Sequence, residues 1–196
     1  MAEFSAKDVA ALRKKTGASM MACKKAMTEC GGDSDKAEVL LRQQDAKIAA
    51  KKSDRATEQG YIGHYVHGGR IGVLVEVACE TDFVAKNDKF QEFLHDISMH
   101  ICALNPLSIS TEDLAPGIVN REREVYLGQV QDKPENIREK IVEGKLQKFY
   151  AENCLMSQAF VKDNDKTIQQ VLAEVIGTLG ENIVIKRFVR LELGAE

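Results

Sequence analysis

The stretch YIGHYVHGGRIGVLVEV, Tyr61 to Val77, predicts a β-hairpin and with it the fold of most of the chain. Two runs rich in β-branched and aromatic residues flank Gly68-Gly69, and glycines readily take the positive φ angles of a two-residue hairpin turn. After the second run, KFQEFLHDISMHICAL (residues 89–104) places apolar residues at helical spacing. Asn87 or Asp88 can cap this helix, and Asn105-Pro106 ends it.

Further helices and a third strand follow the hairpin. The charged segment VNREREVYLGQV (residues 119–130) is predicted to be helical, and a second helix is predicted to start at Pro134. A third predicted helix carries apolar residues from Ile168 to Leu179. The last segment alternates Ile183, Ile185, Val189, Leu191 and Leu193, interrupted only by Arg187. A sheet of only three strands is too small for this many helices to pack on both of its faces. We therefore expect an α+β fold in which a three-stranded antiparallel sheet has helices packed on one side.

Three short helices precede the hairpin. Ser5, Ser19, and Asp33 or Ser34 stand at the three helix starts, and Gly17 and Gly31-Gly32 stand at the ends of the first two. The segment AAKKSDRATEQG (residues 49–60) has no apolar periodicity and is typical of a linker. We expect a helical module with the start of the linker at residues 1–54 and an α+β domain at residues 55–196.

Composition limits the possible partners. The 196 residues include 27 basic and 30 acidic side chains, and no apolar run approaches the roughly 18–20 residues of a membrane span. The basic cluster Lys47, Lys51, Lys52 and Arg55 is most simply a solvated linker, and tryptophan, which stacks on bases, is absent. We expect no direct nucleic-acid or membrane partner. The N-terminal text lacks a signal-peptide core, which predicts a cytoplasmic protein with five reduced cysteines.

No catalytic or metal-binding motif is present in the sequence. His64 and His67 are three apart on a predicted strand, so their side chains point to opposite faces. His95 and His100, five apart on a helix, also diverge. We expect no cofactor and no enzyme activity. A metal-dependent enzyme using His64, His67 and Asp82 stays as a rival hypothesis. Another is a plain adaptor in which the helical module binds a peptide or a ubiquitin-like partner and the second domain is a spacer.

The segment ETDFVAKN (residues 80–87), between the predicted hairpin and the long helix, has two interpretations. Thr81 or Asp82 could cap a helical turn while Phe83 folds back into the core. Alternatively, Asp82 and Phe83 form a presented tip at the end of a rigid strand, with a carboxylate for charge and a phenyl ring for insertion into a partner. A single carboxylate without an acid or base partner suits binding better than catalysis.

Four segments in order resemble one protein family, the bacterial elongation factor Ts family. They are LRKKTGASMMACKKAM (residues 12–27), ETDFVAKN, EKIVEGKLQKFYAENCLMSQAFVKD (residues 139–163) and IVIKRFVRLELG (residues 183–194). The resemblance covers essentially the whole chain. It implies that the N-terminal helices form a ubiquitin-associated-like module, and that the protein is a guanine-nucleotide exchange factor for elongation factor Tu.

The resemblance also implies roles for particular residues. Family members push an Asp-Phe wedge toward the nucleotide's magnesium in elongation factor Tu, which loosens the phosphate contacts and releases GDP so that GTP enters. The matching wedge residues are Asp82 and Phe83, shaped by Thr81 and Val84. The expected second contact surface, in the N-terminal module and the hairpin, comprises Arg13, Met20, Met21, Lys24 and His67.

The chain also departs from the family pattern. Ser157 and Ala159 replace a more usual Glu and Pro, and Ser19 and Ala22 replace a commoner Gly and Asp in the first signature. Many members carry two related core subdomains, whereas this chain has one. A homodimer is the simplest way to supply a second core, and the apolar strand ending FVRLELG offers a sheet edge or face for it. We therefore expect a homodimer that binds two molecules of elongation factor Tu.

Overall fold

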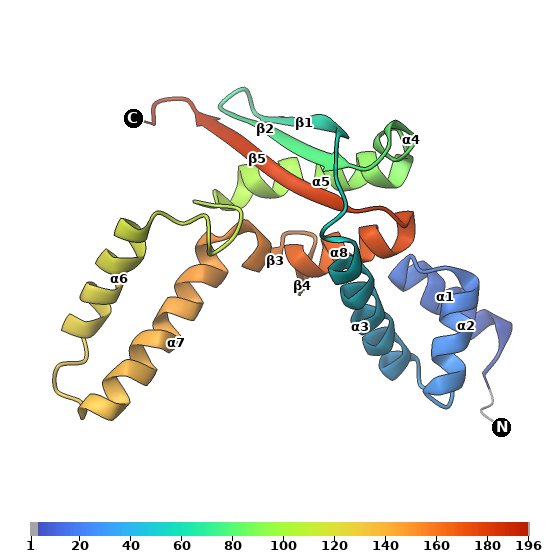
Figure 1. Cartoon of the computed structure of the whole chain (residues 1–196), viewed down its shortest axis with the longest axis horizontal. Helices are drawn as coiled ribbons and strands as arrows, with labels where there is room; N and C mark the ends of the chain where they lie inside the picture. The colour runs from blue at the N-terminus through green and yellow to red at the C-terminus, as the bar shows by residue number, and fades with distance from the viewer. Residues whose placement is uncertain (1–3, 196) are drawn as a thin grey trace.

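A computed structural model describes residues 4–195 of the chain, shown in Figure 1. A β-sheet lies across the top of this view, a helical module lies at one end, and a two-helix arm projects at the other end. Residues 1–3 and 196, the outer ends of the two predicted domains, lie outside the described residues.

The N-terminal module contains three helices, α1 (Ala6–Thr16), α2 (Met20–Glu29) and α3 (Ser34–Lys52). The predicted caps are confirmed: the side chains of Ser5, Ser19 and Asp33 each accept a backbone N–H from the first turn of their helix. Gly17 ends α1 with a φ of 71°, in the left-handed region that favours glycine. The small core of the module consists of Val9, Leu12, Cys23, Ala26, Met27, Ala37 and Leu41.

The third helix is longer than the sequence indicated. Residues 49–60 were expected to form a linker, but α3 continues to Lys52 and β1 begins at Gln59, so only residues 53–58 lack regular structure. Alanines and lysines carry high helix propensity, and Ile48 and Ala49 are partly buried against the core of the larger domain. The helix therefore gains tertiary packing that apolar periodicity did not reveal. The domain boundary between residues 54 and 55 stays a prediction.

The sheet has three antiparallel strands in the order β1-β2-β5, which confirms the α+β prediction. Strands β1 (Gln59–His67) and β2 (Ile71–Cys79) form the hairpin, and β5 (Ile183–Glu192) pairs with the other edge of β2. The connection has three residues, Gly68 to Arg70, one more than the predicted two-residue loop, because His67 pairs with Ile71. Gly68 and Gly69 have φ angles of 55° and 69° and are the central residues of a turn closed by a 2.9 Å hydrogen bond from the N–H of Arg70 to the carbonyl of His67.

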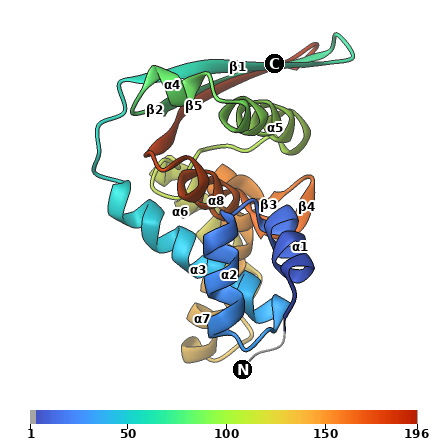
Figure 2. The same cartoon turned by 90° about the vertical axis from the view of Figure 1, so that its right-hand side faces the viewer.

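One face of the sheet is covered by helices. Helix α5 (Asp88–Leu104) lies against β1 and β2, and α8 (Ile168–Leu179) lies below it, beside α3, as Figure 2 shows. A glycine permits the close approach of α5: a Cβ at Gly63 would lie 2.6 Å from Cγ of Leu94. The core between these layers contains Val73, Val75, Val77, Phe90, Phe93, Ile97, Ile101, Leu155, Ile168, Ile183 and Ile185, among others.

A β-bulge divides the apolar residues of β5 between the two faces. Glu76 pairs with Arg187 and Val77 pairs with Ile185, so Lys186 is an extra residue in β5. Because side chains alternate along a strand, the extra residue moves the apolar positions after it to the opposite face. The alternation of apolar residues in the sequence suggested that all of them lie on one face of the sheet. Instead, Ile183 and Ile185 are buried, whereas Val189, Leu191 and Leu193 are exposed. The bulge is one residue from the predicted interruption at Arg187.

The arm is a helical hairpin of α6 (Pro116–Gly128) and α7 (Glu135–Asn153) with its own small core of Val130, Val142 and Leu146. A 3-10 turn, η1 (Leu155–Ser157), and a two-stranded hairpin of β3 (Ala159–Phe160) and β4 (Asp163–Thr167) connect it to α8. The sequence did not predict this second hairpin. Gln158, between the departures at Ser157 and Ala159, is buried and hydrogen-bonds to His100. That residue therefore has a structural role.

Candidate functional site: an exposed tip between β2 and α5

The chain makes a short helical turn, α4 (Asp82–Ala85), directly after β2. Thr81 is its N-cap, with extended backbone angles, and its Oγ1 accepts a hydrogen bond from the N–H of Val84. An isolated four-residue helix is not stable in water, so contacts outside the turn must hold it. The hydrogen bond from Val84 shows that Thr81 caps the turn, as one interpretation of the sequence predicted. Capping alone does not explain why so short a turn is stable.

Contacts with the core and with the next helix fix the rear of the turn. Ala85 is buried, and Val84 is partly buried against the main core. The side chain of Gln91, on α5, donates a hydrogen bond of 2.6 Å to the carbonyl of Ala85. The last part of α4 is thereby attached to the domain, and the first part faces solvent.

Phe83 lies on the solvent side of the turn with 82% of its surface exposed. The interpretation in which this ring folds back into the core is therefore wrong. Burying a phenylalanine side chain is favourable by about 1.5–3 kcal/mol, and this ring contributes little of that free energy to its own domain. An exposed aromatic ring on a fixed turn is the arrangement expected of a binding anchor.

Asp82 lies beside the ring and carries a negative charge. Its Oδ2 accepts a hydrogen bond of 2.8 Å from Nζ of Lys86, one turn later. This hydrogen bond, supported by the positive charge of Lys86, holds the pKa of the Asp82 carboxyl below its usual value. The tip therefore presents an ionised carboxylate next to a phenyl ring.

The polypeptide beneath the tip is tightly held. The buried Sγ of Cys79 lies 3.1 Å from the carbonyl of Thr81 and donates to it. Burial, together with the charge of Glu181, raises the pKa of the Cys79 thiol, which keeps the hydrogen on sulfur. Among the described residues the five cysteines are free thiols, and Cys23, Cys79, Cys102 and Cys154 are buried.

Glu181, in the turn between α8 and β5, is the residue of this site that the sequence did not reveal. Its carboxylate accepts the backbone N–H of Thr81 at 3.0 Å and the Thr81 hydroxyl at 2.6 Å. The two residues are 100 positions apart. No local sequence pattern signals such a contact, because it exists only once α8 and β5 bring Glu181 beside the end of β2.

The second predicted surface lies on the N-terminal module, at the same end of the molecule as the tip (Figures 1 and 2). Arg13 on α1 and Lys24 on α2 are exposed. Met20 is 43% and Met21 is 75% exposed, as expected for neighbouring positions about 100° apart on a helix. Cys23 and Met27 point inward instead and belong to the core of the module.

His67 lies at the far end of the hairpin from the tip. His67 pairs with Ile71 at the turn end of β2, whereas the tip follows Cys79 at the other end of the same strand. At about 3.3 Å per residue, Ile71 and Cys79 are roughly 26 Å apart. The His67 ring stacks on Tyr65, whose hydroxyl lies 3.3 Å from Nδ1. The structure does not bring His67 together with the wedge residues.

Residues 4–195 contain no group of three His, Cys, Asp or Glu side chains that could hold a metal ion. His64 and His67 point to opposite faces of the sheet, as the strand spacing predicted. Across the same described part of the chain, no helix combines the length and the apolar character that a membrane crossing requires.

Comparison with known proteins decides the family. The elongation factor Ts family model matches residues 3–195. The chain belongs to the elongation factor Ts family. A relative named Elongation factor Ts from Nitratidesulfovibrio vulgaris (strain Miyazaki F) is 54% identical over 196 residues, with 98% of each chain covered. Those from Geotalea daltonii and Thermoanaerobacter sp. (strain X514) are 52% and 50% identical, covering 97% of this chain and 90% and 95% of theirs.

Membership confirms the resemblance stated from the sequence motifs, and it places this chain among the translation elongation factors. The three relatives have nearly the same length as this chain, so the resemblance extends over both the helical module and the α+β domain.

Proposed function

We propose that this chain is the guanine-nucleotide exchange factor for elongation factor Tu, acting in the cytoplasm through the tip formed by Asp82 and Phe83. The ring of Phe83 inserts into the partner near its magnesium site, and the carboxylate of Asp82 disturbs the charges that hold the magnesium and the phosphates. GDP leaves, GTP enters and the factor dissociates. No covalent bond is made or broken in this cycle.

The observation that carries the proposal is the exposure of Phe83 on a turn whose rear is fixed. An anchor that is already ordered loses little conformational entropy when it binds. More of the free energy of its contacts is then available to weaken the binding of GDP. Exchange is then a coupling between two ligands of one GTPase: if the factor weakens GDP binding, GDP weakens factor binding by the same ratio.

The exposed surface of the N-terminal module supplies affinity in this proposal. Met20 and Met21 offer flexible apolar contacts, and Arg13 and Lys24 offer positive charge. His67 contacts the partner at a separate place, because it lies at the opposite end of the hairpin. Thr81 and Val84 shape the tip and belong to the same partner-binding segment.

Release of labelled GDP from elongation factor Tu, titrated with the factor, tests the proposal. Phe83→Ala should lower the maximal release rate by at least about tenfold, as expected for removal of a central aromatic anchor. Its unfolding free energy should change by less than about 0.5 kcal/mol, because 82% of the surface of Phe83 is exposed in the folded protein. In the same titration, Lys24→Ala should raise the half-saturating concentration and leave the maximal rate nearly unchanged.

Two results would contradict the proposal. If folded Phe83→Ala protein retained the full maximal rate, the wedge would not be the exchange device. If the parent protein did not accelerate GDP release, the result would favour the hypothesis of a plain adaptor.

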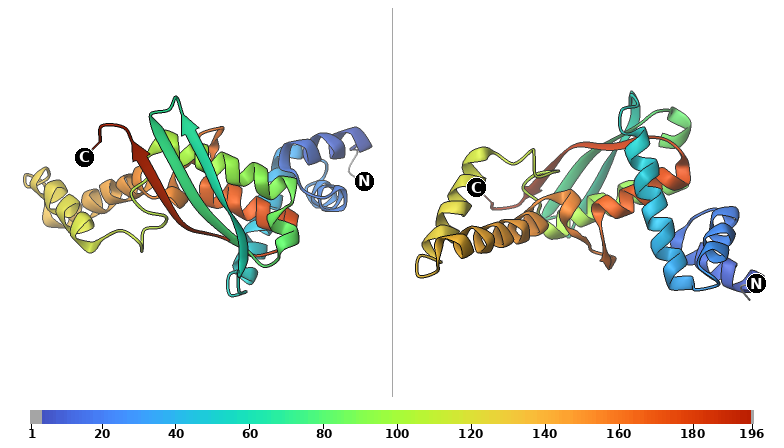
Figure 3. Two further views of the ribbon diagram at one scale, coloured as in Figure 1. Left: turned by 90° about the horizontal axis from the view of Figure 1, so that it is seen from above. Right: turned by 60° about the horizontal axis from the view of Figure 1, so that its bottom comes forward.

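We further propose that the factor is a homodimer that binds two molecules of elongation factor Tu. The supporting feature is the sheet face opposite α5, which no helix covers in the view from above in Figure 3. Leu74 pairs with Val189, and Gly72 pairs with both Val66 and Leu191, so the exposed apolar side chains of three strands are contiguous. A surface of this kind on each of two copies can be buried about a two-fold axis.

A further inference from the structure

The turn between α8 and β5, residues 180–182, contacts the base of the tip at two points. Glu181 accepts both the N–H and the hydroxyl of Thr81. The adjacent backbone N–H of Asn182 donates to Oε1 of Glu80 at 2.6 Å. The two residues that lead from β2 into α4 are therefore both hydrogen-bonded to this one turn.

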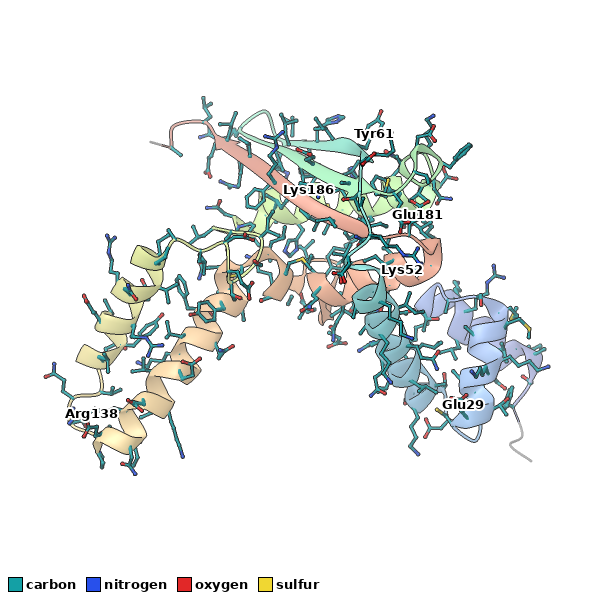
Figure 4. The ribbon with its side chains drawn as sticks, in the orientation of Figure 1. Glu29, Lys52, Tyr61, Arg138, Glu181 and Lys186 are labelled. Atoms are coloured by element: carbon teal, nitrogen blue, oxygen red, sulfur yellow. The ribbon has the colours of Figure 1, made fainter. Side chains whose placement is uncertain are left out.

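The same turn also holds the end of α3. The side-chain amide of Asn182, which is buried, donates to the carbonyl of Ser53 at 3.2 Å and to that of Arg55 at 2.8 Å. Nζ of Lys52 hydrogen-bonds to the carbonyl of Gly180. Figure 4 labels Lys52 and Glu181, which lie at the same end of the sheet, where α3 ends and β5 begins. The turn thus joins the tip to the helix that carries the N-terminal module.

The chemistry of Glu181 sets the orientation of the Thr81 hydroxyl. An ionised carboxylate is only an acceptor, so the hydroxyl must donate its hydrogen to Glu181. Its oxygen lone pairs are then free to accept the N–H of Val84, which is the capping bond of α4. The carboxylate therefore stabilises the capping arrangement as well as the position of the backbone.

We infer that Glu181 is a positioning residue for exchange: it holds Thr81 so that α4 presents Asp82 and Phe83 in one orientation relative to the N-terminal module. The inference rests on the proposed function of the tip. In this role Glu181 does not contact the partner. Its role is to keep the tip ordered before binding, so that the tip and the module engage the partner together.

Mobility of the tip in the free factor provides the first test. The chain has no tryptophan, so Phe83→Trp introduces a single reporter at the exposed position. Time-resolved fluorescence anisotropy should show a small fast-motion amplitude in the Phe83→Trp protein, and Glu181→Ala added to it should at least double that amplitude. Glu92→Gln, which removes a carboxylate paired with Lys89 on the exposed face of α5, should not change it. An unchanged amplitude in the Glu181→Ala protein overturns the inference.

Exchange kinetics, measured with Phe83 in place, provide the second test. Glu181→Ala should lower the maximal rate of GDP release by about tenfold, the size expected for loss of coupled contacts, with a smaller change in the half-saturating concentration. Thr81→Val removes the hydroxyl that donates to Glu181 and should also slow release. Glu92→Gln, the control variant on α5, should retain the parent rate. Thr81→Val and Glu181→Gln together should slow release by less than the product of their separate effects.

The two tests separate failure of the inference from failure of the proposed function. If Phe83→Ala slows release but Glu181→Ala does not, the tip acts in exchange and Glu181 does not position it. If Phe83→Ala has no effect, the proposed function fails, and the anisotropy measurement still decides whether Glu181 orders the tip. Should Glu181→Ala unfold at the assay temperature, Glu181→Gln, which keeps the size of the side chain, is used in both measurements with the same expected direction.

Discussion

At the scale of single residues, Asp45 is placed where a charge is unfavourable. Its carboxyl, on α3, is partly buried beside α8, with Glu174 adding negative charge nearby and Lys166 adding positive charge. Burial first, and then Glu174, raise the pKa of Asp45 to about 6 from the ordinary value of 3.8, although Lys166 opposes the change. Lys166 already forms an ion pair of 2.9 Å with Glu174.

The raised pKa has a defined sign for stability. Between about pH 4 and pH 6 the folded protein keeps a proton on Asp45 that the unfolded chain has released, so this group makes the fold less stable as the pH rises. The penalty is fully present above pH 6. It vanishes below about pH 4, where both states are protonated.

Asp45→Asn should therefore stabilise the protein at pH 7 by about 1 kcal/mol, a value reduced to allow for solvent screening of a partly exposed group. The gain should disappear as the pH falls from 6 to 4. Urea unfolding across this range measures it, with Asp54→Asn as a control at an exposed position. A gain of constant size at every pH would mean that ionisation of Asp45 is not its cause.

At the scale of elements, the contact of α3 with α8 links the helical module to the α+β domain. A Cβ on Gly177 of α8 would lie 2.9 Å from Cγ of Asp45 and closer still to its Oδ1. The two helices can lie this near only because position 177 has no side chain. This crossing helps to set where the N-terminal surface lies relative to the tip.

Gly177→Ala should push α3 away from α8. Overpacking costs about 1–3 kcal/mol, and the better helix propensity of alanine returns up to about 1 kcal/mol, so a net loss of stability of about 1 kcal/mol is expected. Combining it with Asp45→Ala should remove the clash and recover the loss. Urea unfolding at pH 7 gives the unfolding free energies of the parent, the two single variants and the double variant, which together form a double-mutant cycle. If Gly177→Ala alone were stabilising, close packing at this crossing would not be a constraint.

At the scale of the whole molecule, the uncovered sheet face governs the proposed assembly. Leu74 lies on this face with 55% of its surface exposed, between His64 of β1 and Val189 of β5. In a two-fold dimer through this face, a charge placed at position 74 would be brought close to its own copy and out of water. Such a change should break the dimer.

Light scattering at micromolar concentration should give twice the 21.7 kDa monomer mass for the parent protein. Leu74→Glu should give the monomer mass. Leu107→Glu makes the same change at a position of nearly equal exposure, 53%, next to the base of the arm, and should remain a dimer. A parent protein that is a monomer and forms a fully active one-to-one complex with elongation factor Tu would overturn the assembly proposal.

Features that depend on neighbouring residues can be predicted from the amino-acid sequence. Ser5, Ser19 and Asn87 cap helices because a side-chain oxygen reaches an N–H within three residues. The hairpin follows from Gly68-Gly69 and the strand-forming runs on either side of it. The family motifs are also local sequence patterns. The fold class and the family therefore follow from the sequence, which also singles out residues 80–87 but leaves open whether Phe83 is buried or exposed.

Features that depend on residues far apart in the chain are fixed only by the packing of the elements. Whether Phe83 is buried depends on which surfaces surround α4, and Glu181 reaches Thr81 only across the end of the sheet. The extent of α3 depends on its packing against α8, and the face of Leu191 depends on a bulge set by pairing with β2. Local propensity and spacing carry no information about such partners. Burial and long-range hydrogen bonds are therefore decided only when the elements pack together.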